Sequence, residues 1–416
     1  MLRGGNEMEI IPLAKPYIRK EEEAAVLSVL RSGWLTTGKE TLEFEKDFEN
    51  FLRTGASINE KEPLFCMAVN SATSGLHLAL EALGVGPGDA VLIPSYTFTA
   101  TAELVRYLGA EAVFVDITAD SYNMDPEALE QVIIKLNNNP SGLKPRAIIV
   151  VHIGGLPCDM AAINSIAGRY GLSVVEDAAH AFPAIIPDAK NKTAENKTTE
   201  NTEKKEIVWA GTAGDVGVFS FYATKTITTG EGGMVVTRRE DIARRVTVMR
   251  SHGIDRAVWN RYTDTGASWY YEVVAPGFKY NLPDLLAAVG RVQLSRAMEL
   301  LSMREAIAEQ YDSAFKNHPA IVLSPPGGAR HLYTLRLREP SRRDAFIESL
   351  RNQGIGTSVH FIPLHIMPYY RDRYNFKPED LPHSYRRFTE TVSLPIWPGI
   401  TPAQIDRVIE TVLQAL

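Results

Sequence analysis

The sequence predicts an α/β protein with a large domain, built on a mainly parallel seven-stranded sheet covered by helices, and a smaller C-terminal α/β domain. Two observations support this. Short β-branched apolar runs alternate with helical stretches from residue 65 onward, as in parallel sheets covered on both faces. The 416 residues are also enough for a large core and two domains. We assign 1–280, the N-terminal segment and large domain, and 281–416, a long connecting helix and smaller domain. The expected strands are Phe65–Val69, Ala90–Ile93, Ala112–Val115, Ala147–Ile153, Ser173–Val175, Val216–Phe221 and Gly233–Val236.

Two amphipathic helices, Lys20–Arg31 and Glu40–Leu52, precede the sheet. Between them lies Gly33-Trp-Leu-Thr-Thr-Gly38, which suits either a plain connection or a substrate rim containing Trp34 and Thr37. The helices expected between the early strands are Gly75–Leu83, Thr99–Leu108, Pro126–Leu136 and Met160–Tyr170.

Later segments depart from simple strand–helix alternation. Residues 185–207 are rich in Lys, Asn, Thr and Glu and contain little to bury, so we expect a mobile excursion. The last two strands have no helix between them, which predicts an antiparallel part of the sheet. The C-terminal elements are expected to be one long helix Pro283–Lys316, strand His331–Leu337, helix Arg342–Gln353, strand Gly356–Phe361 and helix Pro402–Leu416.

Composition limits the function classes. The net charge is −6 and no basic tract occurs, which argues against nucleic acid as a partner. No apolar run approaches the roughly 20 residues that a membrane span needs, and Met1–Glu9 lacks an apolar signal region. Cys66 and Cys158 stand in apolar segments and predict buried thiols. We therefore expect a cytoplasmic protein that binds neither nucleic acid nor membrane.

The stretch Gly214–Thr237 holds the most informative residue, Lys225, in a polar, glycine-rich turn between two apolar runs. An unpaired ammonium between buried strands costs several kcal/mol. An imine to a carbonyl cofactor removes that charge, and desolvation lowers the lysine pKa, which favours a nucleophile and base. Ser220 stands where its hydroxyl can donate to a phosphate. The alternative is a solvated lysine in a hairpin loop.

Three loops that follow expected strands each allow a functional and a purely structural interpretation. Asn70–Gly75 leads into a helix and suits a phosphate site or a plain N-cap. Phe98 could cover a flat ring or belong to the core. Asp177, in Glu176–His180, could reach a buried cationic nitrogen or cap a helix.

Two histidines near the C-terminus raise the question of a metal. His360 and His365 lie close together after an expected strand, but no third ligand is evident in the sequence. We expect no metal site.

Together these motifs resemble the DegT/DnrJ/StrS family of nucleotide-sugar aminotransferases, pyridoxal-phosphate enzymes of the aspartate-aminotransferase fold (fold type I). The resemblance extends from Ile11 to the final helix. Its most specific motifs are Gly214-Asp-x-Gly-x-Phe-Ser-Phe-x-x-x-Lys225, Gly230-Glu-Gly-Gly233, Val175-Glu-Asp-Ala-Ala-His180 and Gly356-Thr-Ser-Val-His360.

The resemblance implies pyridoxal 5′-phosphate as the cofactor. Lys225 matches the Schiff-base lysine, and Asp177 matches the carboxylate that keeps the pyridine nitrogen protonated. His180 matches a Gln or His near the ring hydroxyl, and Phe98 matches the aromatic that stacks on the ring.

The resemblance implies a phosphate-binding site, here called the phosphate cradle, formed by residues 72–74, Ser220 and a residue of a second chain. Thr73, the backbone of Ala72 and Ser74, and Ser220 match the phosphate contacts, although Ala72 stands where the family often has glycine. Asn281 matches an asparagine that reaches the phosphate of the neighbouring subunit, which implies a homodimer with shared active sites.

The implied reaction moves an amino group from an amino-acid donor, glutamate in this family, to a keto-sugar nucleotide for polysaccharide biosynthesis. The candidate substrate residues are Trp34, Thr37, His331 and His360. Leu282 and Pro283 replace the aromatic and arginine that often follow the asparagine, so no arginine contact is expected there.

Two alternatives remain within the resemblance. A sugar dehydratase on the same scaffold carries histidine at the Schiff-base position, which Lys225 argues against. A catalytically silent cofactor-binding sensor or regulator is expected to carry a DNA-binding helix-turn-helix or a basic patch, and the sequence shows neither.

Overall fold

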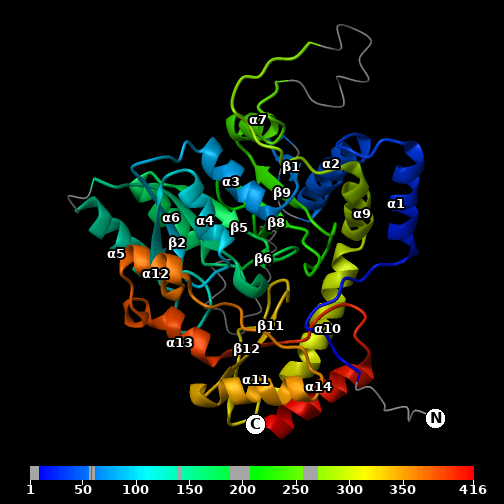
Figure 1. Cartoon of the computed structure of the whole chain (residues 1–416), viewed down its shortest axis with the longest axis vertical. Helices are drawn as coiled ribbons and strands as arrows, with labels where there is room; N and C mark the ends of the chain where they lie inside the picture. Colours follow the sequence, from blue (N-terminus) through cyan, green and yellow to red (C-terminus); the bar gives the residue numbers. More distant parts are fainter. Residues whose placement is uncertain (1–8, 56–57, 59–60, 139–141, 188–206, 256–269) are drawn as a thin grey trace, which may run out of the picture.

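The computed structural model places a large helix-covered sheet above a smaller C-terminal part in the view of Figure 1. In this view α11 (Arg343–Asn352) and α14 (Pro402–Ala415) lie below the sheet, and α1 (Lys20–Ser32) lies at its right. The described residues are 9–55, 58, 61–138, 142–187, 207–255 and 270–416.

The large sheet confirms the prediction of seven strands. Its order is β1-β9-β8-β5-β4-β2-β3. β9 pairs antiparallel with β1 and with β8, and the remaining neighbours are parallel. The strands are β1 (Phe65–Val69), β2 (Asp89–Pro94), β3 (Glu111–Val115), β4 (Lys144–Val151), β5 (Ser173–Asp177), β8 (Val216–Ser220) and β9 (Gly233–Thr237).

Helices cover both faces of the sheet, because successive strand residues point to opposite sides. Val91 and Ile149 pack towards α3, α4 and α7, whereas Leu92 and Ile148 pack towards α5 and α6. None of the helices among the described residues has the length and apolar character of a membrane span. These helices are α3 (Ala72–Ala82), α4 (Ala100–Tyr107), α5 (Pro126–Asn137), α6 (Met160–Tyr170) and α7 (Glu240–Met249).

The excursion expected at 185–207 falls mostly on residues 188–206, which lie outside the described residues. Its described ends form a short antiparallel pair, β6 (Ile185–Ile186) and β7 (Val208–Trp209). The indole of Trp209 donates to the Leu52 carbonyl at 3.1 Å, which fixes this pair to the end of α2 (Lys39–Thr54).

The single long helix expected at Pro283–Lys316 is wrong. The structure has α9 (Asp284–Ser295) and α10 (Ala297–Phe315), separated at Arg296, whose φ of −112° and ψ of 9° leave the helical region. At the break the Arg296 guanidinium donates to the buried Glu22 carboxylate of α1 at 2.8 Å. This ion pair lies outside the apolar pattern, so the pattern did not indicate the break.

The C-terminal part contains an antiparallel sheet of β10 (Ile321–Leu323), β11 (Tyr333–Leu337) and β12 (Thr391–Leu394). The strand expected at Gly356–Phe361 is wrong, since this segment forms an isolated bridge from Ser358 to Ser393 within the described chain. Gly356 instead donates to the Ile11 carbonyl at 2.8 Å, so the segment is held between the N-terminal segment and β12.

Segments near both ends of the chain contact the part of the molecule to which they do not belong in sequence. Ile11 packs in the C-terminal core, and α13 (Pro382–Glu390) returns to the large sheet. There Asp116, after β3, accepts the Ser384 N–H at 2.8 Å and the His383 N–H at 2.9 Å, so it caps α13 from another element. The boundary at residue 280 stays a prediction, but the packing crosses it.

Asp284 performs a similar function for α2 and the loop before it. Its carboxylate accepts the N–H groups of Gly38, Glu40 and Thr41 at 2.7, 3.1 and 3.0 Å and the Thr41 hydroxyl at 2.7 Å. These groups are orphan donors at a helix start. The buried carboxylate at the start of α9 therefore fixes the Trp34 loop.

We predict that Asp284→Asn lowers the free energy of unfolding by about 2 kcal/mol, because an amide presents N–H groups to donors that need an acceptor. Urea denaturation would measure this. The exposed Asp120→Asn is the control, with a change within about 0.5 kcal/mol. An Asp284→Asn variant as stable as the control would contradict the capping role.

Candidate active site

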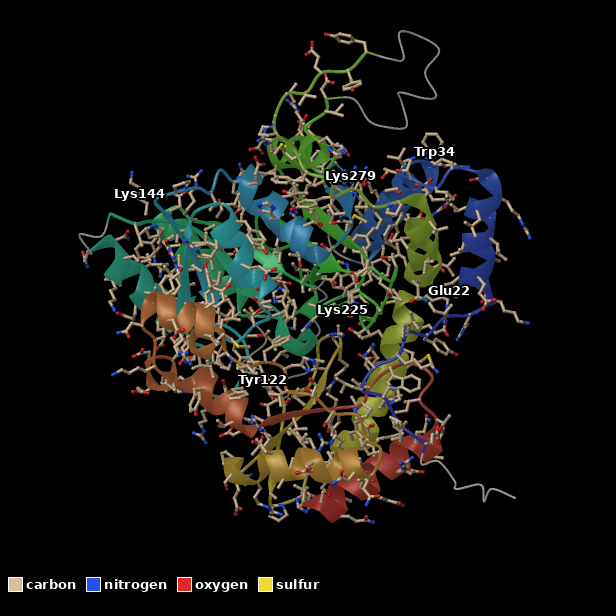
Figure 2. The ribbon with its side chains drawn as sticks, viewed as in Figure 1. Glu22, Trp34, Tyr122, Lys144, Lys225 and Lys279 are labelled. Carbon is tan, nitrogen blue, oxygen red and sulfur yellow. The ribbon has the colours of Figure 1, made fainter. Side chains whose placement is uncertain are left out.

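Lys225 lies in the turn between β8 and β9, near the centre of the molecule where the sheet meets the C-terminal part (Figure 2). Its N–H donates to the Tyr222 carbonyl at 2.9 Å, which tightens the turn. The side chain is half-buried. Burial lowers the pKa of the Lys225 ammonium to about 8, although the Asp177 carboxylate acts in the opposite direction. Lys225 is therefore poised to lose its proton near neutral pH.

Asp177 ends β5, which is the parallel neighbour of β8, so both residues lie at the same carboxyl edge of the sheet. The carboxylate accepts the Ala179 N–H at 3.1 Å and the Thr101 hydroxyl at 3.2 Å. Burial raises the pKa of Asp177, and the two hydrogen bonds and the Lys225 charge oppose this rise. The carboxylate is 6% exposed, which suits a single buried cationic partner.

Three histidines from distant segments gather around this pair. The ring of His180 lies 4.4 Å from that of His331. Burial lowers the pKa values of His180, His331 and His360, and the charge of Lys225 lowers them further. The pKa of His360 falls to about 4, so this ring is neutral at pH 7.

The tautomer of His180 follows from its backbone contact. The Gly154 N–H, in the loop after β4, donates to His180 Nδ1 at 3.2 Å. Because Nδ1 accepts this hydrogen bond, the ring hydrogen of the neutral imidazole is on Nε2. The Gly154 carbonyl also accepts the His331 N–H at 3.1 Å, so one peptide segment orients both histidines.

The two histidines considered for a metal are held by different serines. His360 Nδ1 pairs with the Ser393 hydroxyl at 2.8 Å, and His365 Nδ1 pairs with the Ser95 hydroxyl at 2.7 Å. Across the described ranges, no group of three or more His, Cys, Asp or Glu side chains is arranged to bind a metal.

The expected phosphate cradle lies where α3 begins beside β8 and β9. Gly233 is opposite Ser220 in the sheet, and a Cβ on Gly233 would lie 2.8 Å from the Ala72 nitrogen. Ser74 is committed to the turn, because its N–H donates to Ser71 Oγ at 3.1 Å. The first N–H groups of a helix have no intrahelical acceptor, so those of Ala72 and Thr73 suit an anion.

The aromatic residue expected to cover a ring is exposed. Phe98 is 58% exposed, so its alternative assignment to the core is wrong. Its ring lies 6.1 Å from that of Phe361, which stacks 5.8 Å from the His180 ring. The Phe98 ring thus has an uncovered apolar face on the side of the molecule where the histidines gather.

Trp34, Thr37 and Asn281 form a hydrogen-bonded group. Asn281 donates to the Thr37 hydroxyl at 2.7 Å, and the Trp34 indole donates to the Thr37 carbonyl at 3.3 Å. Figure 2 places Trp34 beside α1 and α2, apart from Lys225. Trp34 therefore lies away from the Lys225 cluster of the same chain. Asn281 instead forms an isolated bridge with Val69 of β1, which pairs with Gly233.

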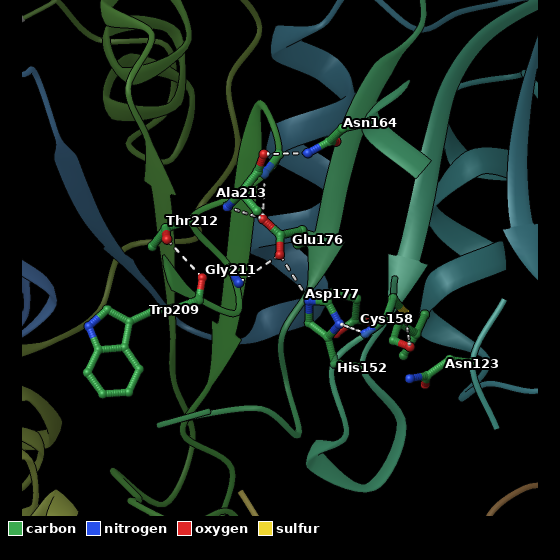
Figure 3. Close-up of polar contacts among 12 residues, drawn as sticks. Asn123, His152, Cys158, Asn164, Glu176, Asp177, Trp209, Gly211, Thr212 and Ala213 are labelled. Atoms are coloured by element: carbon green, nitrogen blue, oxygen red, sulfur yellow. Dashed lines mark hydrogen bonds and ion pairs between the residues drawn. The ribbon is translucent and has the colours of Figure 1, made fainter. Parts of the chain in front are cut away.

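The sequence analysis missed a carboxylate network beside Asp177, shown in Figure 3. Glu176 accepts the N–H groups of Gly211, Ala213 and Gly214 at 2.8, 2.7 and 2.6 Å, and His152 donates to it at 2.9 Å. These contacts fix the turn before β8 to β5, and hence Ser220 relative to Asp177. A glutamate inside an apolar strand was the available signal.

A second missed residue is Arg304 of α10, which is 1% exposed. Its guanidinium donates to the carbonyls of Ile396, His331 and Thr224 at 2.9, 3.3 and 3.4 Å. The signal was its place on the apolar face of the helix, three residues after Leu301. Thr101, the Asp177 partner, gave no signal in the sequence.

The fold and the lysine–carboxylate pair at the sheet edge place the protein in the class of pyridoxal-phosphate-dependent aminotransferases of fold type I. The chain belongs to the DegT/DnrJ/EryC1/StrS aminotransferase family, whose model matches residues 16–413. It is accordingly a pyridoxal-phosphate-dependent sugar aminotransferase, which sets aside the sensor and dehydratase alternatives.

Proteins similar to this chain align with it over nearly its whole length. Spore coat polysaccharide biosynthesis protein SpsC of Bacillus subtilis is 40% identical over 410 residues, covering 97% of this chain and 96% of SpsC. The putative sugar aminotransferase Spr1654 of Streptococcus pneumoniae, in its PMP-form, superposes with a TM-score of 0.82 at 29% identity over 97% and 98% of the two chains. Helicobacter pylori PseC, an aminotransferase involved in the biosynthesis of pseudoaminic acid, has a TM-score of 0.81 at 27% identity, over 98% and 100%.

The described residues fit a pyridoxal-phosphate cofactor. Gly233 leaves open the space beside the Ala72 nitrogen that a side chain would fill, next to the Ser220 hydroxyl. Asp177 supplies a buried carboxylate and Lys225 an amine with a lowered pKa, which are the groups that a pyridinium and an aldehyde require.

We predict that Asp177→Asn leaves the cofactor-free protein at least as stable as the wild type at pH 7.5. Burial raises the pKa of Asp177 in the folded state, so its ionised form costs stability above that pKa and the cost disappears as the pH falls through it. Thermal melts at pH 7.5 and pH 5 would measure this. The exposed Asp344→Asn is the control, and an Asp177→Asn variant clearly less stable at pH 7.5 would contradict the prediction.

Proposed function

We propose that this protein transfers an amino group from an amino acid, glutamate in the first instance, to a keto-sugar linked to a nucleoside diphosphate. The observation that supports this most directly is the half-buried Lys225, with its pKa lowered to about 8, beside the buried carboxylate of Asp177. Bound pyridoxal phosphate would supply an aldehyde for the amine and an electron sink for the resulting carbanion.

The roles of the chain's own groups follow from their positions. Lys225 binds the cofactor and, once released, moves a proton as general base and acid. Asp177 holds a proton at the ring nitrogen by charge. His180 offers its Nε2 hydrogen to the ring oxygen, because Gly154 occupies Nδ1. Phe98 covers one face of the ring.

The phosphate is bound at the start of α3. Ala72 and Thr73 offer backbone N–H groups, and Thr73 and Ser220 offer hydroxyls. His331 and His360 are assigned to the substrate side of the site, since both rings are neutral and available as hydrogen-bonding partners. SpsC, a polysaccharide biosynthesis protein, supports a sugar that enters a polysaccharide.

The second part of the proposal is a homodimer with shared active sites. The Trp34 indole and the Asn281 amide both donate to Thr37, and Trp34 lies apart from Lys225 in the same chain. Leucines of the surrounding surface are partly uncovered, and they suit burial against a second copy. These leucines are Leu27, Leu30, Leu35 and Leu42.

We predict that Lys225→Ala abolishes the visible absorbance of the cofactor–lysine adduct and lowers amine exchange with glutamate by at least about 10²-fold. The control is Lys144→Ala, a lysine at the exposed start of β4, which is expected to behave as the wild type. Spectra of the purified protein with added glutamate, followed by assays on a panel of keto-sugar nucleotides, would test both halves of the reaction. Undiminished exchange in Lys225→Ala would rule out the assignment.

We predict that mixing Lys225→Ala and Asn281→Ala chains restores activity. A mixed dimer has one site with both lesions and one intact site, so the mixture should recover roughly the activity of one site per mixed dimer. Each variant alone should remain impaired. If the mixture stays inactive although mass measurement shows mixed dimers, or if a monomer is fully active, the shared site is wrong.

A further inference from the structure

Arg304 connects three segments that surround Lys225. Its Nη1 donates to the Ile396 carbonyl at 2.9 Å and to the His331 carbonyl at 3.3 Å, and its Nη2 donates to the Thr224 carbonyl at 3.4 Å. Thr224 belongs to the lysine turn, His331 precedes β11 and Ile396 follows β12. One side chain of α10 therefore joins the large sheet to the C-terminal part at the site.

The charge of Arg304 has no acidic partner within the described part of the chain. The other well-buried arginines each have one: Arg296 pairs with Glu22 at 2.8 Å, Arg250 with Glu45 at 2.5 Å and Arg387 with Glu390 at 3.6 Å. Burial lowers the pKa of Arg304 to about 10, so it stays protonated at neutral pH. A buried charge without a counter-ion is costly, and carbonyl dipoles offset that cost only in part.

We propose that Arg304 is a positioning residue for the amine transfer: it fixes the Lys225 turn to the C-terminal part and sets an uncompensated positive charge beside the Lys225 amine. This inference deepens the proposed function and rests on it. Arg304 acts through Lys225 and does not itself contact the reacting atoms.

The positional half of the proposal concerns the peptide between Thr224 and Lys225. The carbonyl of this peptide accepts from Arg304, and its N–H donates to the Tyr222 carbonyl at 2.9 Å. Both polar groups of the peptide are thus occupied, which fixes the direction in which the lysine side chain leaves the turn.

The electrostatic half concerns the charges that face Lys225. Asp177, from β5, raises the Lys225 pKa, whereas Arg304, from α10, lowers it in addition to burial. The histidines that face the same space, His180, His331 and His360, have lowered pKa values and are neutral at pH 7. Among the described residues, Arg304 is therefore the cation that opposes the effect of Asp177 on Lys225, and it favours the unprotonated amine that attacks a carbonyl.

The test compares Arg304→Gln with the wild type. Glutamine keeps two N–H donors but removes the charge, so the Lys225 pKa is expected to rise, with a severalfold loss of free amine at pH 7. Competitive acetylation of the full cofactor-free chain with acetic anhydride across pH, with the Lys225 peptide followed by mass spectrometry, measures this pKa without activity. Arg304→Lys, which keeps a cation, should stay nearer the wild type.

Arg387→Gln is the matched control. Arg387 is also buried and donates to backbone carbonyls, those of Ala119 at 2.7 Å and Ser121 at 3.1 Å, but it is not among the groups that perturb Lys225. This control should leave the Lys225 pKa unchanged even if it destabilises the fold. An equal rise in Arg387→Gln would show a general structural effect and overturn the proposal.

Two further results would overturn the proposed role of Arg304. A folded Arg304→Gln chain with an unchanged Lys225 pKa overturns the inference, as does a wild-type Lys225 pKa at the ordinary value of 10.5. The measurement on the wild type needs no variant, so it can be made even if Arg304→Gln does not fold. Because the acetylation measures the cofactor-free chain, its result is independent of glutamate exchange, whose failure would instead overturn the proposed function.

Discussion

The site depends on the juxtaposition of Lys225 and Asp177 at the carboxyl edge of the large sheet. Burial disfavours the charged form of both side chains, whereas their mutual attraction favours it. Their attraction offsets only part of the burial cost, because burial is the largest cause of both pKa shifts. The parallel pairing of β5 with β8 creates the juxtaposition, because strands that run the same way deliver their ends to the same edge.

Carboxylates from neighbouring elements fix the loops around this pair. Glu176 fixes the turn before β8, Asp284 fixes the Trp34 loop and Asp116 fixes the start of α13. In each case one buried carboxylate accepts several backbone N–H groups that have no partner in their own element. Arg304 does the converse, because it donates to three backbone carbonyls. Buried charged side chains therefore cap backbone groups of other elements, and these contacts fix loops far apart in sequence around Lys225 and Asp177.

The sequence predicted the large sheet well because its signals are local. Apolar runs that alternate with helical stretches predicted all seven strands, and the resemblance of the segment from Ser220 to Gly233 to the family predicted a cofactor site there. The C-terminal half was predicted less well. At the break, Arg296 pairs with Glu22, 274 residues away, and the segment Gly356–Phe361 contacts Ile11 and Ser393 where a strand was expected. Such partners leave no trace in a local pattern.

The sequence by itself determined the family and, through the family, the cofactor class, because its motifs around Lys225, Asp177 and Ala72 resemble those of the aminotransferases. Only the tertiary structure decided which charged and neutral side chains surround Lys225. It brought the neutral histidines and Arg304 around Lys225, and it placed Trp34 apart from the lysine of its own chain. The physical reason is that the pKa of a buried group is set by distance, burial and charge in space, none of which local sequence spacing fixes.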